Sequence, residues 1–216
     1  MSASGRILPD GGILRYTLIE RVMHWIAGFF YVYLLLTGLA FYSPRLYWIA
    51  TMLGGGPTVR VWHPWAGVVF TLVLVWMFKE WGRDMRMTGL DRAWNKAIGH
   101  YIRNEDEKLP PAGRFNAGQK GFFWLMFWGG LLLLASGLVL WLTEYIPWGM
   151  NWLRQLAVLV HVAAALLTIG GFIIHVYMGT AVVRGGFNSV IRGEVSRQWA
   201  ETHHPVWLKE AGDRKE

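Results

Sequence analysis

Four long runs of apolar residues, separated by polar segments, dominate the pattern along this chain. Each run is close to or above the roughly 20 residues that a helix needs to cross a bilayer core, and none contains Asp, Glu, Lys or Arg. The pattern predicts an all-α membrane protein built as a bundle of four transmembrane helices. The predicted spans are residues 22–42, 61–78, 121–143 and 156–183.

The polar segments complete a single predicted membrane domain, residues 1–216, with a long loop at 79–120 and a tail at 184–216. Within the loop, the stretch GLDRAWNKAIGHY (89–101) spaces its apolar residues as one face of a helix, which is typical of a helix on the membrane surface. The first twenty residues lack the apolar core of a secretory signal peptide. We therefore expect the first span to act as its own insertion signal.

The basic residues indicate which side of the membrane each segment faces. Of the 21 Lys and Arg residues, 18 lie before the first span, in the loop 79–120 or in the tail, and the other two connections hold three. Because segments rich in Lys and Arg stay in the cytoplasm, both termini and the 79–120 loop are predicted to be cytoplasmic. The net charge of +7 is then a signal of topology, and nucleic acid is not expected as a partner.

The chain has no cysteine. This excludes thiolate-bound iron–sulfur clusters, disulfides, a thiol nucleophile and covalent haem attachment through C-x-x-C-H. A cofactor would therefore have to be held by histidine, methionine or oxygen atoms, and the space between the helices is the expected place.

Four of the seven histidines lie inside the predicted spans: His24, His63, His161 and His175. With both termini inside, His63 and His161 are expected near the outer face, and His24 and His175 near the inner face. His161 and His175 are fourteen residues apart, which places them about 21 Å apart on nearly the same side of one helix. That distance excludes a metal ion shared by these two residues.

Two histidine pairs at two depths suit two haems b, because haem b takes one imidazole on each face and needs no covalent link. Glycines inside the spans would give such planar groups room, although membrane helices also use glycine for close packing: Gly28, Gly38, Gly67, Gly129, Gly130, Gly137, Gly170 and Gly171. A histidine-relay proton channel or transporter is the alternative from another class, but such proteins usually place carboxylates in the membrane as well. A structural anchor for a peripheral enzyme is a third alternative. Neither alternative predicts two pairs at matching depths.

Residues 115–120, with the sequence FNAGQK, precede the third span on the inner side. Asn116, Gln119 and the backbone N–H groups around Gly118 could donate hydrogen bonds to the carbonyl oxygens of a quinone. The same residues also suit a helix-entry cap followed by a flexible glycine. From the residues alone, the cap is the favoured interpretation.

Several motifs together resemble the gamma subunit of membrane-bound formate dehydrogenase, a di-haem cytochrome b. They are RVMHW (21–25), RVWHPWAG (60–67), FNAGQK, the histidine fourteen residues before HVYM (175–178), and the tail GEVSRQWAETHHPVWLKE (193–210). The resemblance extends through nearly the whole chain. The histidine pattern alone would place the chain only among bacterial b-type cytochromes that serve hydrogenases and similar enzymes, and this is the alternative function in the same class.

This resemblance implies roles for particular residues. His63 and His161 would ligate an outer haem b, and His24 and His175 an inner one. Asn116 and Gly118, with the neighbouring Gln119, would lie at a site for menaquinone or ubiquinone beside the inner haem, and no catalytic residue is assigned to this chain. Members of the family usually have tyrosine where this chain has Phe115, which removes a hydroxyl near the expected quinone.

The resemblance also implies partners and an electron path. Electrons from formate would pass through a molybdenum- or tungsten-containing alpha subunit and an iron–sulfur beta subunit at the outer face, cross from the outer to the inner haem, and reduce a quinone near the cytoplasmic face. The chain would also anchor this heterotrimer in the lipid bilayer, where a higher oligomer of the heterotrimer is conceivable. The tail histidines His203 and His204 fit the motif, but we expect them in a solvated or partner-binding segment.

Overall fold

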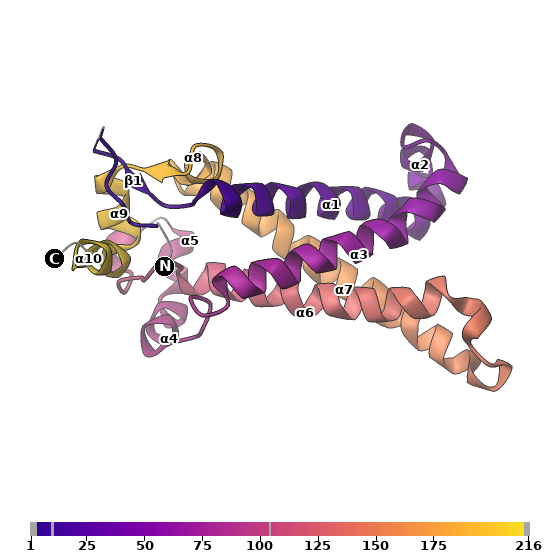
Figure 1. Ribbon diagram of the computed structural model, residues 1–216. Helices are drawn as coiled ribbons and strands as arrows, with labels where there is room; N and C mark the ends of the chain where they lie inside the picture. Colours follow the sequence, from indigo (N-terminus) through magenta and orange to yellow (C-terminus); the bar gives the residue numbers. More distant parts are fainter. Residues whose placement is uncertain (1–3, 10, 104, 214–216) are drawn as a thin grey trace. The chain divides into compact units, whose positions relative to one another are not determined.

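The computed structural model describes residues 4–9, 11–103 and 105–213. In this part of the chain, four helices are long and apolar enough to cross a membrane (Figure 1), as the sequence predicts. They are α1 (Leu18–Tyr42), α3 (Gly56–Trp81), α6 (Ala117–Trp141) and α7 (Asn151–Tyr177). The last of them is extended by a 3-10 turn, η4 (Trp148–Met150), at its start and by a π-helical turn, η5 (Met178–Val182), at its end.

Short elements join and follow the long helices. The connection from α1 to α3 contains η1 (Pro44–Leu46) and α2 (Trp48–Met52), and the connection from α6 to α7 contains η3 (Thr143–Tyr145). The loop between α3 and α6 holds α4 (Gly89–Lys96), α5 (Ile98–Ile102) and η2 (Asp106–Lys108). The tail holds α8 (Gly186–Ile191), β2 (Glu194–Val195), α9 (Arg197–His203) and α10 (Pro205–Asp213).

Two details differ from the sequence-based expectation. The surface helix expected over 89–101 is two helices, α4 and α5, because the backbone leaves the helical region at Ala97. The structure also contains two very short strands, since β2 pairs antiparallel with β1 (Ile13–Leu14) near the N-terminus. Two-residue strands carry no alternating pattern long enough to be recognised in the sequence.

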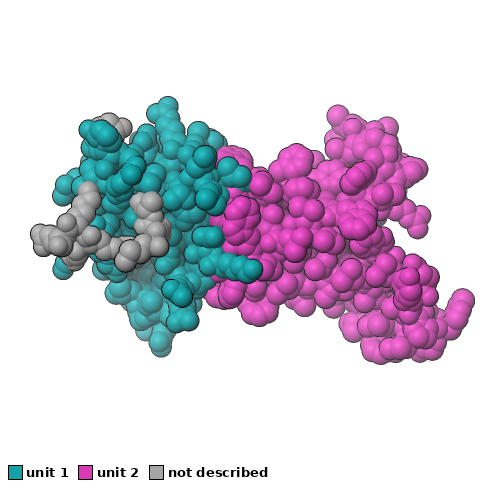
Figure 2. All heavy atoms as spheres, viewed as in Figure 1, with its two compact units in different colours: residues 1–22, 79–123, 173–216 teal, residues 23–78, 124–172 magenta. Residues whose placement is uncertain are grey.

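The chain forms two compact units, which Figure 2 distinguishes by colour. Unit 1 comprises Met1–Val22, Lys79–Phe123 and Ile173–Glu216. Unit 2 comprises Met23–Phe78 and Trp124–Phe172, and so contains most of each long helix.

Unit 2 is held together by aromatic and small residues between its helices. Tyr31 of α1 lies against Phe70 of α3 and Phe172 of α7, with ring centres 5.6 Å and 4.9 Å apart. A Cβ atom on Gly129 of α6 would lie only 2.6 Å from Thr168 Cγ2 of α7. Glycine at position 129 therefore allows α6 and α7 to approach closely, as small residues commonly do in membrane bundles.

Unit 1 is assembled from three separate parts of the sequence. Ile13 of β1, Val195 of β2, Ala200 of α9 and Trp207 of α10 form its buried apolar cluster. Gly193, with a φ of 89°, lets its carbonyl accept hydrogen bonds from the backbone N–H groups of residues 15 and 16, and a Cβ there would lie 2.7 Å from a backbone oxygen. The tail is therefore packed against the N-terminal segment.

Candidate cofactor-binding site

His63 and His161 come from different helices and face each other within unit 2. His63 lies in the first turns of α3 and His161 in the third turn of α7. Both are half-buried, and their ring centres are 6.4 Å apart with the ring planes turned by 57°. The sequence predicts this pair, and the structure brings its two members together.

The separation of the two rings fits a metal ion held between them. A metal–imidazole bond is about 2.0–2.1 Å long and the nitrogen lies about 1.1 Å from its ring centre, so two imidazoles on opposite sides of one metal have ring centres about 6.3 Å apart. Rotating one ring about the line that joins the two ring centres changes the angle between the ring planes but not the distance between the centres. Within the described residues, no group of three or more His, Cys, Asp or Glu side chains could hold a metal ion.

Each imidazole of this pair has a hydroxyl neighbour on another helix. Thr37 Oγ1 of α1 lies 2.7 Å from His63 Nδ1, and Ser136 Oγ of α6 lies 3.0 Å from His161 Nδ1. Both hydroxyl residues are buried, Thr37 completely. The sequence alone does not identify Thr37 and Ser136 as neighbours of the histidines. Serine and threonine are common in membrane helices, and nothing local to positions 37 or 136 points to a histidine.

The second predicted pair is divided between the two units. His24 belongs to unit 2, where its ring meets Trp25 edge-on with centres 5.7 Å apart. His175 belongs to unit 1, where it stacks on Phe122 of α6 with ring centres 4.3 Å apart and planes within 3° of parallel. The pairing of His24 with His175 stays a prediction.

Asn116 and Gln119 form a reciprocal cap at the start of α6. The backbone N–H of Gln119 donates to Asn116 Oδ1 at 2.9 Å, and the backbone N–H of Asn116 donates to Gln119 Oε1 at 3.0 Å. This is the arrangement of a capping box, in which two N–H groups without helical partners are satisfied at once. The interpretation that the residues alone favour, a helix-entry cap, is confirmed.

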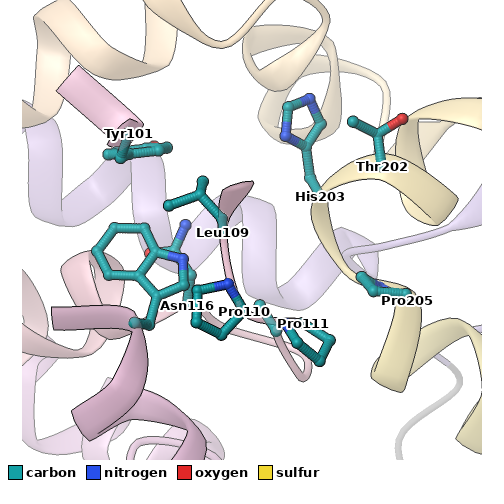
Figure 3. A pocket seen from close by; sticks show the side chains of 10 residues that line it. Tyr101, Leu109, Pro110, Pro111, Asn116, Thr202, His203 and Pro205 are labelled. Atoms are coloured by element: carbon teal, nitrogen blue, oxygen red, sulfur yellow. The ribbon is translucent and has the colours of Figure 1, made fainter. Parts of the chain in front are cut away.

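Asn116 also lines a cavity of about 130 Å³ within unit 1. Figure 3 shows Asn116 and Tyr101 on one side of this cavity, and Thr202 and His203 on the other. A cavity of about 150 Å³ accepts a benzene ring, so the space is on the scale of one six-membered ring. Aromatic, leucine, alanine and proline side chains line it together with polar ones: Trp94, Tyr101, Leu109, Pro110, Pro111, Ala112, Asn116, Thr202, His203 and Pro205.

The other residues predicted for a quinone site have different surroundings. Gly118 lies beside the cavity wall, since a Cβ there would be 3.4 Å from the ring of Trp94. Gln119 uses its side chain in the cap. Phe115 is buried, with its ring 6.2 Å from that of Tyr16 and 5.6 Å from that of Trp81. Of these three residues, none is part of the cavity lining.

A buried ion pair fixes the helix that carries the wall residue Trp94. Lys120 Nζ of α6 donates to Asp91 Oδ2 of α4 at 2.7 Å and to the Arg86 carbonyl at 3.0 Å. Asp91 also forms a capping box with Thr88 at the start of α4. Burial acts to raise the pKa of Asp91, but its hydrogen bonds with Lys120 and Thr88 outweigh burial and hold that pKa below its ordinary value.

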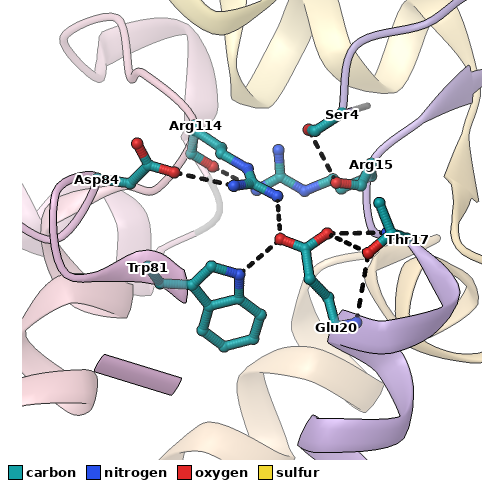
Figure 4. Close-up of polar contacts among 7 residues, drawn as sticks. All are labelled: Ser4, Arg15, Thr17, Glu20, Trp81, Asp84 and Arg114. Carbon is teal, nitrogen blue, oxygen red and sulfur yellow. Dashed lines mark hydrogen bonds and ion pairs between the residues drawn. The ribbon is translucent and has the colours of Figure 1, made fainter. Parts of the chain in front are cut away.

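A second buried network joins the N-terminal segment to the 79–123 part of unit 1 (Figure 4). Glu20 Oε1 accepts hydrogen bonds from Arg114 Nη2 at 2.6 Å and from the Trp81 indole at 2.7 Å. Arg114 Nη1 donates to Asp84 at 2.9 Å. Burial acts to lower the pKa of Arg114, but the Glu20 and Asp84 carboxylates outweigh it and raise that pKa above its ordinary value.

The tail meets the N-terminal segment through His204. Of the two surroundings expected for the tail histidines, the solvated one is wrong for His204, and the partner-binding one stays a prediction. His204 is only 1% exposed instead of solvated. Its Nδ1–H donates to the Gly113 carbonyl at 2.7 Å, so its Nε2 accepts from Arg15 Nη2 at 3.1 Å. Burial, together with the charge of Arg15, holds the pKa of His204 well below its usual range. His203, beside it, lines the cavity.

The glycines of the spans divide by surroundings. Gly129 and Gly130 serve close packing, because a Cβ on either would overlap a side chain of a neighbouring helix. Gly38 and Gly137 lie beside His63 and His161, respectively. A Cβ at Gly28 or Gly170 would have no described atom within 4 Å. Close packing, one of the two uses that the sequence leaves open, therefore occurs at Gly129 and Gly130, whereas room for a planar cofactor stays a prediction.

Known proteins match this chain over nearly its whole length. The model of the prokaryotic cytochrome b561 family matches residues 15–193, which include all four long helices, the four histidines of the spans and Asn116, Gly118 and Gln119. The cytochrome b556(Fdn) subunit of the nitrate-inducible formate dehydrogenase of Escherichia coli K12 is 30% identical over 198 residues, 92% of this chain and 91% of that protein. The cytochrome b556(fdo) subunit of formate dehydrogenase of the same strain is 32% identical, with 92% of each chain covered. The cytochrome b556 subunit of the Haemophilus influenzae formate dehydrogenase is 26% identical, over 94% of this chain and 85% of that protein.

Proposed function

The chain belongs to the prokaryotic cytochrome b561 family, and we propose that it is the haem-carrying cytochrome b subunit of a respiratory formate dehydrogenase. Curated relatives with that name share about a third of its residues across more than nine-tenths of both chains. The four apolar helices support an integral membrane protein, which would anchor the complex in the membrane. The motifs that resemble the gamma subunit of this enzyme lead to the same function.

His63 and His161 would hold one haem b, the outer one. The observation that carries this proposal is the 6.4 Å between their ring centres, which is the spacing of two axial imidazoles. Haem b supplies one-electron transfer when bound. His24 and His175 would hold a second haem on the basis of the sequence pattern and of the resemblance.

Asn116 would bind the quinone, menaquinone or ubiquinone, through its amide nitrogen. Its Oδ1 is occupied by the cap, whereas its Nδ2 donates to no described residue and the side chain borders the ring-sized cavity. A carbonyl oxygen of a quinone ring would accept from this Nδ2–H. The surrounding tryptophan, tyrosine, leucine and proline side chains would exclude water from the faces of the ring.

The direction of electron flow follows from the proposed topology. With the termini and the 79–120 loop in the cytoplasm, His63 and His161 lie toward the outside, where an iron–sulfur subunit and a molybdenum or tungsten subunit would deliver electrons from formate. Quinone would be reduced near the cytoplasmic face of the inner membrane with protons from that side. Moving one electron from the outer to the inner side of the membrane, against the negative potential inside, costs about 2.3 kcal/mol per 100 mV.

The haem assignment is tested by replacing His63 or His161 with alanine in the complex and recording reduced-minus-oxidised spectra with haem quantification. Each variant should lose one of two haems and stop electron transfer from the partner to quinone. His100 provides the control, because it belongs to the surface helix α5 and pairs with Glu105; His100→Ala should keep both haems. Two intact haems in His63→Ala would refute the assignment of that ligand.

The quinone assignment is tested by Asn116→Asp, which keeps the capping oxygen and removes the amide donor. Because aspartate caps helices as well as asparagine does, α6 should still begin at the same residue. Loss of one hydrogen bond of about 0.5–1.5 kcal/mol should weaken quinone binding roughly 2- to 12-fold, while both haems are still reduced by the partner. Gln119→Glu is the matched control, since it adds a charge in the same turn, keeps its capping oxygen and does not border the cavity. Equal quinone kinetics in Asn116→Asp and wild type would refute the quinone assignment and leave Asn116 with its capping role alone.

A further inference from the structure

Two short motifs occupy equivalent positions on α1 and α6. Thr37-Gly38-Leu39 and Ser136-Gly137-Leu138 each consist of a hydroxyl residue, a glycine and a leucine. In both cases the hydroxyl residue is the twentieth of a 25-residue helix. Each motif contacts one histidine of the His63/His161 pair through its first two residues.

The hydrogen bonds of these hydroxyl groups fix the direction of their contact with the histidines. A hydroxyl group has one hydrogen to donate. Thr37 lies 2.8 Å from the Tyr33 carbonyl, and Ser136 lies 2.6 Å from the Leu132 carbonyl. A carbonyl oxygen can only accept, so in each case the single hydroxyl hydrogen points back to the helix. With that hydrogen donated to the carbonyl, the hydroxyl oxygen is left to accept from the imidazole, and this arrangement puts the imidazole hydrogen on Nδ1.

This direction has a consequence for the other ring nitrogen. A neutral imidazole with its hydrogen on Nδ1 has a free lone pair on Nε2. A lone pair is what a metal ligand requires, and the hydrogen bond made by the opposite nitrogen sets which nitrogen binds. With this direction of hydrogen bonding, Nε2 of His63 and Nε2 of His161 would each be available to a metal ion.

The glycine that follows each hydroxyl residue leaves room for the ring. A Cβ at Gly38 would lie 3.8 Å from His63 Cε1, and a Cβ at Gly137 would lie 3.3 Å from His161 Cε1. The second distance is tighter than an ordinary contact, so alanine at position 137 would press on the imidazole. The atoms that these glycines approach belong to the two histidines, and this distinguishes them from Gly129 and Gly130, which approach packing side chains.

We propose that Thr37-Gly38 and Ser136-Gly137 are two matched histidine sockets, which orient His63 and His161 and set the redox potential of the haem between them. This inference rests on the proposed function of that histidine pair. Accepting the Nδ1–H bond makes the imidazole a stronger electron donor to iron. A stronger donor stabilises the oxidised iron, so the two sockets lower the potential of this haem relative to the same histidines without them.

The experiment is redox potentiometry of the purified complex with electron paramagnetic resonance of the oxidised haems. Thr37→Val and Ser136→Ala remove the hydroxyl groups, and Thr37→Ser and Ser136→Thr keep them. Thr71→Val is the matched control, because Thr71 is a buried threonine of α3 whose hydroxyl donates to the Gly67 carbonyl. Thr37→Val and Ser136→Ala should raise the potential of one and the same haem, move its resonance, and weaken its retention about 10- to 100-fold, while the other three variants resemble wild type.

Two results would overturn the inference. One is an unchanged potential and resonance in both Thr37→Val and Ser136→Ala at full haem occupancy. The other is a change of the same size in Thr71→Val or in Thr37→Ser, which would show that the shape of the side chain, and not its hydroxyl group, is responsible. If Thr37→Val loses this haem entirely while Thr37→Ser keeps it, the inference is supported. A wild-type chain that holds no haem would instead refute the proposed function.

Discussion

The buried ion pair between Lys120 and Asp91 gives the sharpest prediction about unit 1. The two side chains are 8% and 7% exposed, and the charged atoms are 2.7 Å apart. Lys120→Met keeps the aliphatic stem but leaves the Asp91 carboxylate buried with no cation. Removing one partner of a buried pair costs about 3–5 kcal/mol, which is roughly two to three and a half orders of magnitude in the equilibrium for local opening.

Hydrogen exchange of the α4 amides in the detergent-solubilised complex measures that opening directly. Exchange should speed up most around Trp94, which lies one turn beyond Asp91 on the same helix and forms a wall of the cavity. The double variant Lys120→Met/Asp91→Asn should recover most of the loss, because it leaves no buried charge and asparagine still caps α4 at Thr88.

A surface pair provides the control for this measurement. Arg197 and Glu201 are 70% and 54% exposed and lie one turn apart on α9. Breaking such an exposed pair changes stability by at most about 0.5 kcal/mol, so Arg197→Met should leave exchange near its wild-type rate. The reasoning is refuted if the double variant exchanges as fast as, or faster than, Lys120→Met, because the two residues would then not be energetically coupled.

Two further predictions concern the tail and the bundle. The low pKa of His204 keeps it neutral in the folded state, whereas the unfolded chain protonates it near pH 6.5, so the packing of α9 and α10 should weaken as pH falls below about 6.5 and be fully present above it. Arg15 and His203 are the charged and titratable groups that lower this pKa further. After correction for the intrinsic pH dependence of amide exchange, the loss of protection in α9 on acidification should disappear in His204→Gln; an unchanged loss there would contradict the assignment. Gly129→Ala should cost about 1–3 kcal/mol through overpacking against α7, measured by thermal unfolding, whereas Gly121→Ala on the same helix, with no described atom within 4 Å of its Cβ, should not destabilise the protein.

Asn116 has one role that can be read from neighbouring residues in the sequence and one that depends on residues far away in the sequence. Its cap on α6 depends on a residue three positions along the chain, and such a spacing can be read from the sequence. The cavity beside it is built from α4, α5, residues 109–112 and the tail from Thr202 to Pro205. The tail residues come 86 to 89 positions after Asn116 in the sequence, so only the folded chain shows that they meet at this amide.

The sequence by itself determined the four long helices and the type of side chain, histidine, that could bind a metal-containing cofactor. Crossing a bilayer requires an uninterrupted apolar run, and the absence of cysteine leaves histidine as the strongest metal ligand; both are local properties that survive without knowledge of the fold. The tertiary structure decided which groups act on those ligands. Thr37 reaches His63 across 26 positions and Ser136 reaches His161 across 25, while His204 is buried against Arg15 across 189. A pattern of polar and apolar residues carries no information about such contacts, because they depend on how separate segments pack together.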